Sequence, residues 1–158
     1  MSDIVQKTAA ALAGFLEGTE QVLAAAKAQL EGNTMRTATS AGLWVGLGGV
    51  VGAVAGSQVA ARGGGDLAKV LRGGAVLAVT ETRLVVLDAT KVGANPKEAV
   101  LAIDRAAITG VSTGSKRVAL VKMMTVTIAT GDDGNISFEI PKVGTKDAQR
   151  VVEALTTR

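Results

Sequence analysis

Short runs of β-branched residues, separated by turn-forming residues, fill the chain from Ala75 onward. They are AVLAV, RLVVLDA, AVLAI, ITGVS and a long VALVKMMTVTIAT. Valine, isoleucine and threonine favour strands, and runs of this length and spacing are typical of antiparallel sheets. Met123 and Met124 are adjacent in the last run, so in a strand they point to opposite faces and at least one belongs in the core. We therefore predict an antiparallel sheet that begins near residue 75.

A turn signal, GDDGN, separates TVTIAT from ISFEIPK towards the end of this region. Aspartate and glycine tolerate the positive backbone φ that tight hairpin turns require. The sequence predicts a hairpin here. Turn formation explains Asp132 and Asp133 better than a catalytic pair of carboxylates does.

An amphipathic helix is predicted at each end of the chain. The first covers about residues 3–16, with Ser2 or Asp3 as its cap and Gly18 at its end. Its helically spaced residues are Ile4, Val5, Thr8, Ala11, Leu12, Phe15 and Leu16. Near the C-terminus, Thr145 is expected to cap a helix that closes one face of the sheet. The apolar stripe of that helix consists of Ala148, Val151, Val152 and Leu155.

The segment EQVLAAAKAQL, residues 20–30, fits two structures. Its alanines favour a helix, while its apolar residues also alternate as they would on one face of a strand. These alternating residues are Val22, Ala24, Ala26, Ala28 and Leu30. Propensity alone predicts a helix.

The motif T-x-x-R-L, formed by Thr80, Arg83 and Leu84, lies in the stretch VTETRLVVLDA. Together with the later strands and closing helix, it resembles the YokE-type bacterial pleckstrin-homology-like (PH-like) domains, in which this motif forms a tight turn and the start of a hairpin. The resemblance covers residues 20–31 and 74–157. It implies that residues 20–30 form a first strand, and that the domain binds or scaffolds other molecules without catalytic residues.

The resemblance also implies an α+β fold, with a PH-like antiparallel sheet or barrel closed by a C-terminal helix. An N-terminal amphipathic helix, residues 1–18, precedes the PH-like domain, residues 19–158. The family has a short connection between its first two strands, whereas this chain has a glycine-rich, apolar insertion at residues 34–73. We expect part of this insertion to be helical.

The glycine-rich segment, residues 37–61, contains no charged residue and is bounded by Arg36 and Arg62. As a helix its 25 residues would extend about 37 Å, enough for a hydrocarbon core of about 30 Å. Glycine and alanine make its insertion into a membrane only weakly favourable. A single crossing would also separate residues 20–30 from a partner strand near residues 75–80.

A phosphate-binding loop is a weaker interpretation of the same segment. GLGGVVG partly resembles a dinucleotide-binding fingerprint, and Asp66 follows Gly46 by 20 residues. However, the preceding TATSAG is a poor strand, and Val51 stands where the fingerprint requires glycine. The later GVSTGSK lacks the spacing of a P-loop.

Glycines recur every four residues in this segment, which predicts a helix face without side chains. Such a glycine zipper lets another helix approach closely, and we expect it to drive self-association. Its residues are Gly42, Gly46, Gly48, Gly52 and Gly56. The alternatives are a mobile insertion or a cover for the chain's own sheet. On the other face, Trp44 and its apolar neighbours would pack on the sheet or lie in a lipid interface.

Basic residues are concentrated around the glycine-rich segment, where residues 36–73 contain four lysines and arginines against one acidic residue. With Trp44, they are the predicted membrane-surface contacts: Arg36, Arg62, Lys69 and Arg72. Making an apolar insertion soluble is an equally good explanation of these charges. A second basic cluster, Lys116, Arg117 and Lys122, is expected on a strand or hairpin and is more simply a solvated surface than a contact for an acidic partner.

Several classes of function are disfavoured by composition. The chain has no cysteine or histidine, which removes the usual ligands of zinc and the commonest catalytic base. We expect no cofactor, no metal and no catalytic residue. One tryptophan, two phenylalanines and no tyrosine disfavour nucleic-acid binding by base stacking. The opening residues lack a secretory signal because Asp3 falls in the would-be basic region, so we expect a cytoplasmic protein.

The sequence as a whole predicts a non-enzymatic PH-like scaffolding or interaction module. We expect it to form a homo-oligomer through the glycine zipper and to attach peripherally to an anionic membrane surface, at its inner face. Its protein partner is not identified by the sequence. The alternative is a single-pass membrane-anchored protein whose PH-like domain recruits a protein partner.

Overall fold

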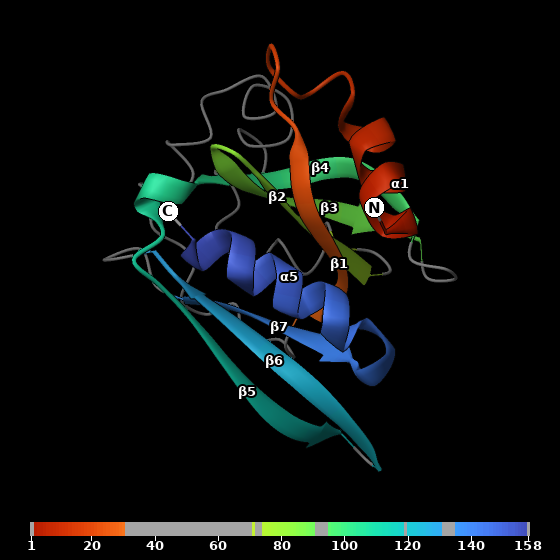
Figure 1. The fold of residues 1–158 in the computed structure, drawn as a ribbon. Helices are drawn as coiled ribbons and strands as arrows, with labels where there is room; N and C mark the ends of the chain where they lie inside the picture. The colour runs from red at the N-terminus through yellow and green to blue at the C-terminus, as the bar shows by residue number, and fades with distance from the viewer. Residues whose placement is uncertain are drawn as a thin grey trace.

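The structure, a computed structural model, describes residues 2–30, 71, 74–90, 95–118, 120–130 and 135–157. Within these ranges the chain forms seven strands with an α-helix before and after them (Figure 1). The elements are α1 (Asp3–Leu12), β1 (Val22–Leu30), β2 (Gly74–Thr80), β3 (Arg83–Ala89), β4 (Pro96–Asp104), η3 (Arg105–Ala107), β5 (Gly110–Val118), β6 (Val121–Ala129), β7 (Asn135–Pro141), η5 (Lys142–Gly144) and α5 (Thr145–Thr156). The predicted α+β fold is confirmed.

All strand pairs are antiparallel, in the order β4-β3-β2-β1-β7-β6-β5. Strand β1 pairs with β2 along most of its length but meets β7 only at its last two residues, Gln29 and Leu30. The sheet therefore consists of two meanders joined through the end of β1. Its edge strands, β4 and β5, do not pair with each other in the described ranges, so the sheet is open and does not close as a barrel.

Strands β2 and β3 form the most deeply buried part of the core. Residues 75–80 and 84–89 are all buried, whichever face of the sheet they point to. A strand covered on both faces has no solvent side, so its sequence reads as a continuous apolar run and not as an alternation. This explains why the apolar residues in AVLAV and RLVVLDA follow one another without alternating with polar ones.

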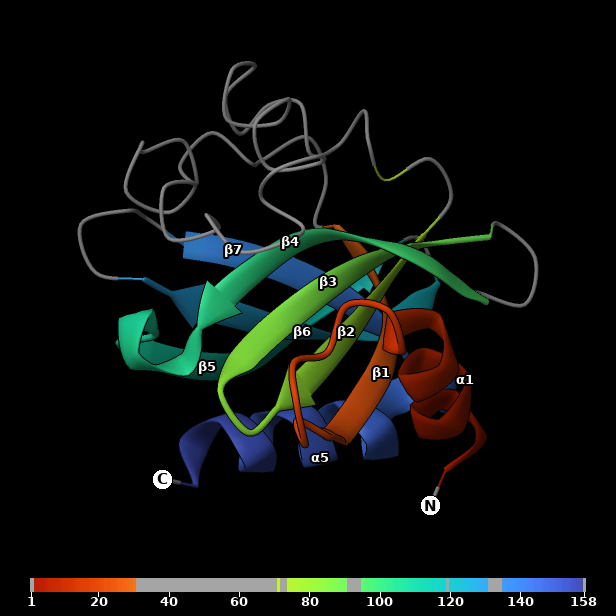
Figure 2. The same cartoon turned by 90° about the horizontal axis from the view of Figure 1, so that it is seen from above.

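Residues 20–30 contain the strand that the resemblance implied. Helix propensity alone predicted the wrong structure here. Both α1 and α5 pack against β1, and Figures 1 and 2 show α5 across one face of the sheet with α1 beside β1. The buried side chains of β1 are mainly alanines: Ala24, Ala25, Ala26 and Ala28. Small side chains let the helices lie close to the strand, so tertiary packing overrides helix propensity here.

The closing helix α5 has the predicted apolar stripe. Ala148, Val151 and Leu155 are buried, and Val152 packs partly buried against the same core. The predicted cap is wrong, because Thr145 is the first helical residue and Gly144 occupies the N-cap position. A Cβ at Gly144 would lie 3.2 Å from the Ile140 side chain, so a glycine fits this tight junction best.

Helix α1 ends at Leu12, four residues earlier than predicted. The Phe15 N–H donates to the Leu12 carbonyl at 2.7 Å, an i to i+3 bond, and residues 13–16 form a turn. The apolar spacing continues through residue 16 because Phe15 and Leu16 still pack on the core, but from a turn. Gly18 follows with a positive φ of 59°, which a side chain would disfavour.

The long run VALVKMMTVTIAT was interpreted as one strand, and this is wrong. Strand β5 continues to Val118, the chain reverses, and β6 begins at Val121. The run contains no Gly, Asn or Asp at the reversal, so no turn signal marked it. Met123 is buried and Met124 partly buried against the core, as predicted for neighbours on opposite faces.

The hairpin predicted at GDDGN is confirmed by the pairing of β6 with β7 on either side of it. Ala129 of β6 faces Asn135 of β7, while residues 131–134 themselves lie outside the described ranges. The helical part predicted for residues 34–73 also lies outside them, apart from residue 71. None of the described helices is both long and apolar enough to span a membrane.

Candidate functional site

All residues predicted for self-association or membrane contact lie outside the described ranges. They are Gly42, Gly46, Gly48, Gly52, Gly56, Trp44, Arg36, Arg62, Lys69 and Arg72. Their roles stay predictions. Three other features of the described residues are candidates for function: the T-x-x-R-L turn, a pocket beside Arg105, and the tip of the β5–β6 hairpin.

The T-x-x-R-L turn joins β2 to β3 through hydrogen bonds to Thr80. The Thr80 hydroxyl oxygen accepts from the backbone N–H of Arg83 at 3.0 Å and of Thr82 at 3.3 Å. The same hydroxyl donates to Glu20 Oε1 at 2.5 Å, and the Thr82 hydroxyl donates to that oxygen at 2.6 Å. This confirms the tight turn and adds the carboxylate of Glu20, which lies outside the motif.

Glu20 and Arg83 form a two-pronged ion pair beside this turn. Arg83 Nη2 donates to Glu20 Oε2 at 2.6 Å, and Nε donates to Oε1 at 3.0 Å. The guanidinium carbon of Arg83 also lies 4.8 Å from the centre of the Phe15 ring. Only 13% of the Arg83 side chain and 6% of the Glu20 side chain is exposed.

The ion pair lowers the pKa of Glu20 from 4.5 to about 2. The hydrogen bond from Arg83 is the main cause; burial opposes it, and the hydroxyls of Thr80 and Thr82 add to it. The pKa of Arg83 is raised, chiefly by the hydrogen bond to Glu20. Both carboxylate oxygens are occupied by donors of the chain itself, so this cluster holds the fold together and is not arranged for catalysis.

Arg105 connects the β2–β3 turn with the end of α5. Its Nη1 donates to the Glu81 carbonyl at 3.3 Å, and its Nη2 donates to the Thr157 carbonyl at 2.6 Å and to the Ala154 carbonyl. Its backbone N–H donates to the Thr82 carbonyl at 2.9 Å. Carbonyls at the end of a helix have no partner within the helix and carry partial negative charge, so a guanidinium suits this place.

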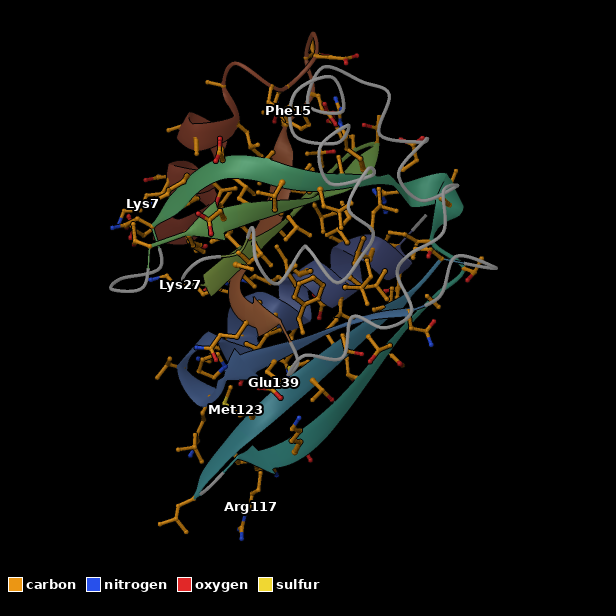
Figure 3. The ribbon with its side chains drawn as sticks, turned by 180° about the vertical axis from the view of Figure 1, so that it is seen from behind. Lys7, Phe15, Lys27, Arg117, Met123 and Glu139 are labelled. Carbon is orange, nitrogen blue, oxygen red and sulfur yellow. The ribbon has the colours of Figure 1, made fainter. Side chains whose placement is uncertain are left out.

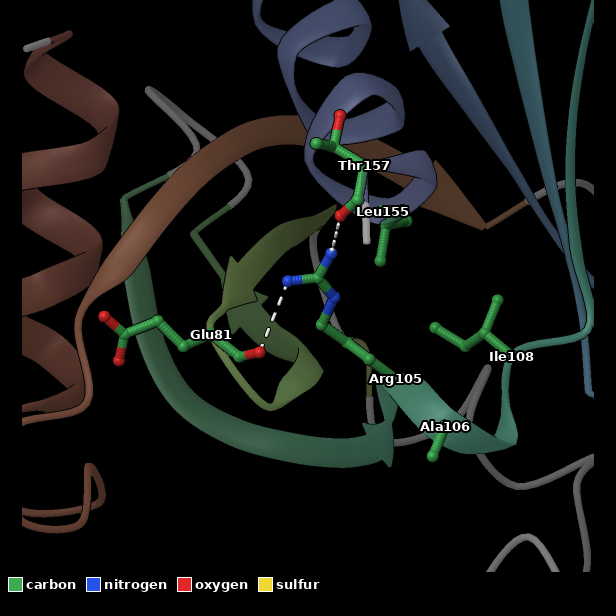
Figure 4. Close-up of a pocket in the computed structure, with 6 residues that line it drawn as sticks. All are labelled: Glu81, Arg105, Ala106, Ile108, Leu155 and Thr157. Atoms are coloured by element: carbon green, nitrogen blue, oxygen red, sulfur yellow. Dashed lines mark hydrogen bonds between the residues drawn. The ribbon is translucent and has the colours of Figure 1, made fainter.

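A pocket of about 380 Å³ opens beside Arg105 (Figure 4). Its lining residues are Glu81, Arg105, Ala106, Ile108, Leu155 and Thr157. The Arg105 guanidinium is committed to backbone carbonyls, and Ala106, Ile108 and Leu155 offer only apolar contacts. The lining includes the Glu81 carboxylate and the Thr157 hydroxyl, which lie on opposite sides of the pocket in Figure 4. In the described ranges, no group of three or more His, Cys, Asp or Glu residues is placed to hold a metal ion.

The predicted basic cluster lies on the β5–β6 hairpin. Lys116 forms an ion pair with Glu139 at 2.6 Å, which places it against β7. Arg117 and Lys122 are cross-strand partners nearer the tip, and both are exposed. The structure thus separates Lys116 from the other two. The sequence left a strand or a hairpin open here but did not mark where the chain reverses, so the apolar residues at the tip were missed: Leu120 is 97% exposed and Val121 is 54% exposed.

Comparisons with known proteins give fold-level likeness only. No family model matches the chain, and no curated protein matches it. A pleckstrin homology domain from Shewanella amazonensis SB2B is similar with a TM-score of 0.45 and 13% identity, covering 93% of this chain and 97% of that one. The Vps36 N-terminal PH domain is similar with a TM-score of 0.36 and 12% identity, covering 54% of this chain and 64% of that one. The narrower YokE-type resemblance stays a prediction.

Proposed function

We propose that this chain is a non-enzymatic interaction module with a PH-like fold. It forms a homo-oligomer through the glycine zipper and attaches peripherally to an anionic membrane surface on the cytoplasmic side. The observation that supports peripheral attachment, as opposed to a single membrane span, is the pairing of β1 with β2, because these strands flank the glycine-rich segment. Ala28 and Ala75, on either side of it, are paired residues.

This pairing favours peripheral attachment over the single-pass alternative. A segment that crossed a bilayer once would carry its two ends to opposite sides of a hydrocarbon core about 30 Å thick. Residues 28 and 75 are register partners in one antiparallel ladder and therefore lie on the same side. Self-association or contact with the membrane surface satisfies this geometry without a second crossing of the bilayer.

The glycine zipper is tested by replacing Gly52 with leucine. A side chain there would block close approach of a second helix, so we expect Gly52→Leu to lower the mass of the assembly measured by light scattering. Gly14→Leu is the matched control, since a Cβ at Gly14 meets nothing within 4 Å. An unchanged mass for Gly52→Leu would contradict the zipper, and loss of assembly in both variants would show that the effect is not specific to it.

A further inference from the structure

The tip of the β5–β6 hairpin carries apolar side chains that the fold itself does not use. Leu120 lies at the chain reversal and is 97% exposed, and the adjoining Val121 is 54% exposed. Tight turns are usually made by Gly, Asn or Asp, because these residues tolerate the backbone conformation and are readily solvated. A leucine at this position contributes little to turn formation or to the core, so an external contact is the better explanation of it.

The hairpin extends beyond the rest of the sheet. Strand β7 pairs with β6 only as far as Met123, opposite Pro141, whereas β5 and β6 continue to pair up to Val118 and Val121. Figure 1 shows this pair reaching past the end of β7, and Figure 3 shows Arg117 at its far end, beyond Met123 and Glu139. The tip therefore presents a narrow, convex, apolar end to its surroundings.

Basic side chains flank the apolar tip on both strands. Arg117 and Lys122 are register partners and are both exposed. The acidic residue nearest to them in the β7 ladder, Glu139, is already engaged by Lys116. At the same end of β6, η5 follows Pro141 and contains the exposed Lys142 and Val143, the latter 96% exposed. Apolar side chains surrounded by cations are complementary to an anionic lipid surface.

We propose that the hairpin tip, defined as Arg117, Leu120, Val121 and Lys122, inserts into an anionic membrane surface. Leu120 and Val121 enter the boundary between headgroups and acyl chains, and the two cations bind lipid phosphates and carboxylates. A protein partner fits this surface less well, because a stable protein interface needs about 800 Å² from each side and a narrow convex tip offers little area. The inference rests on the peripheral membrane attachment proposed above. It assigns the membrane contact to residues outside the glycine-rich segment.

Flotation with vesicles of phosphatidylcholine and phosphatidylserine tests this assignment. We expect Leu120→Ser to reduce the vesicle partition constant about tenfold, as loss of one buried leucine would. Arg117→Gln together with Lys122→Gln should also lower binding, and adding salt should weaken wild-type binding. Leu23→Ser is the matched control, since Leu23 is a 49% exposed leucine near the start of β1, and it should float like the wild type.

Trp44→Ser distinguishes the tip from the glycine-rich segment. If Trp44→Ser abolishes flotation and Leu120→Ser does not, the tip assignment is overturned while peripheral attachment stands. If the wild type does not float, the tip assignment and the peripheral attachment both fail. The mass of the wild type in light scattering still tests self-association separately. A changed mass for Leu120→Ser with unchanged flotation would make the tip a contact between copies, which also overturns the assignment.

A direct readout of depth uses the chain's single tryptophan. In a Trp44→Phe background, Leu120→Trp places the only indole at the tip. We expect its fluorescence to shift to shorter wavelength with anionic vesicles and to be quenched by lipids brominated in the upper acyl chain. Vesicle-bound protein whose emission stays at the wavelength of exposed tryptophan would overturn the proposal.

Discussion

Glu20 and Arg83 lie 63 positions apart in the sequence and meet as an ion pair, with Glu20 Oε2 2.6 Å from Arg83 Nη2. Glu20 precedes β1 and Arg83 begins β3, so the pair links the entry of the first strand to the β2–β3 turn. The hydroxyls of Thr80 and Thr82 donate to the same carboxylate. The threonine and the arginine of the T-x-x-R-L motif thus both bind one carboxylate.

Removing the Glu20 carboxylate should destabilise the fold substantially. Glu20→Ala leaves the Arg83 guanidinium largely buried without its counter-charge, and losing one member of a buried pair costs about 3 kcal/mol. The free energy of unfolding, measured by urea denaturation, should fall by that amount. Glu17→Ala is the control, because Glu17 is 66% exposed and 3.8 Å from Arg83. Equal effects of the two substitutions would contradict the special role of Glu20.

The lowered pKa of Glu20 predicts acid sensitivity. The unfolded chain takes up a proton near pH 4.5 and the folded chain only near pH 2, so the stabilisation is complete above pH 4.5 and is lost as the pH falls towards 2. A shift of this size corresponds to about 3 kcal/mol. Unfolding free energies of the wild type and Glu20→Gln, measured from pH 6 to pH 2, should converge at the acid end. Parallel curves over that range would exclude Glu20 as the cause.

Arg105 should determine how firmly the last turn of α5 is held. Arg105→Ala removes the donors to the Thr157 and Glu81 carbonyls and should cost about 1.5–3 kcal/mol, as expected for hydrogen bonds from a charged group. Hydrogen exchange should quicken for the amides at the end of α5. Arg150→Ala serves as the control, since Arg150 is 62% exposed and its ion pair is with Asp147 in the same helix. Unchanged exchange in Arg105→Ala would show that core packing alone holds this turn.

Much of the fold could be predicted from local sequence pattern. The predictions that were wrong have identifiable physical causes. The spacing of apolar residues predicts the buried strands β2 and β3 and the apolar stripe of α5. For β1 the alanines favoured the wrong structure, because close helix packing against a strand is not encoded locally. The β5–β6 reversal was missed because Leu120 carries no turn signal. The early end of α1 was missed because Phe15 keeps helical spacing while packing from a turn.

The candidate sites were less predictable than the fold. The T-x-x-R-L motif identified Thr80 and Arg83, but nothing in the local sequence pointed to Glu20 as their partner, because that contact depends on strand order. The hairpin tip required knowledge of where the chain reverses. The glycine zipper and its flanking cations stay predictions from the sequence alone.

The mass of the wild-type protein in solution tests the central proposal, self-association, most directly. Light scattering should be measured without detergent or lipid over a hundredfold range of protein concentration. Our account predicts one defined multiple of the 15.9 kDa chain mass. A mass of 15.9 kDa at every concentration would contradict it.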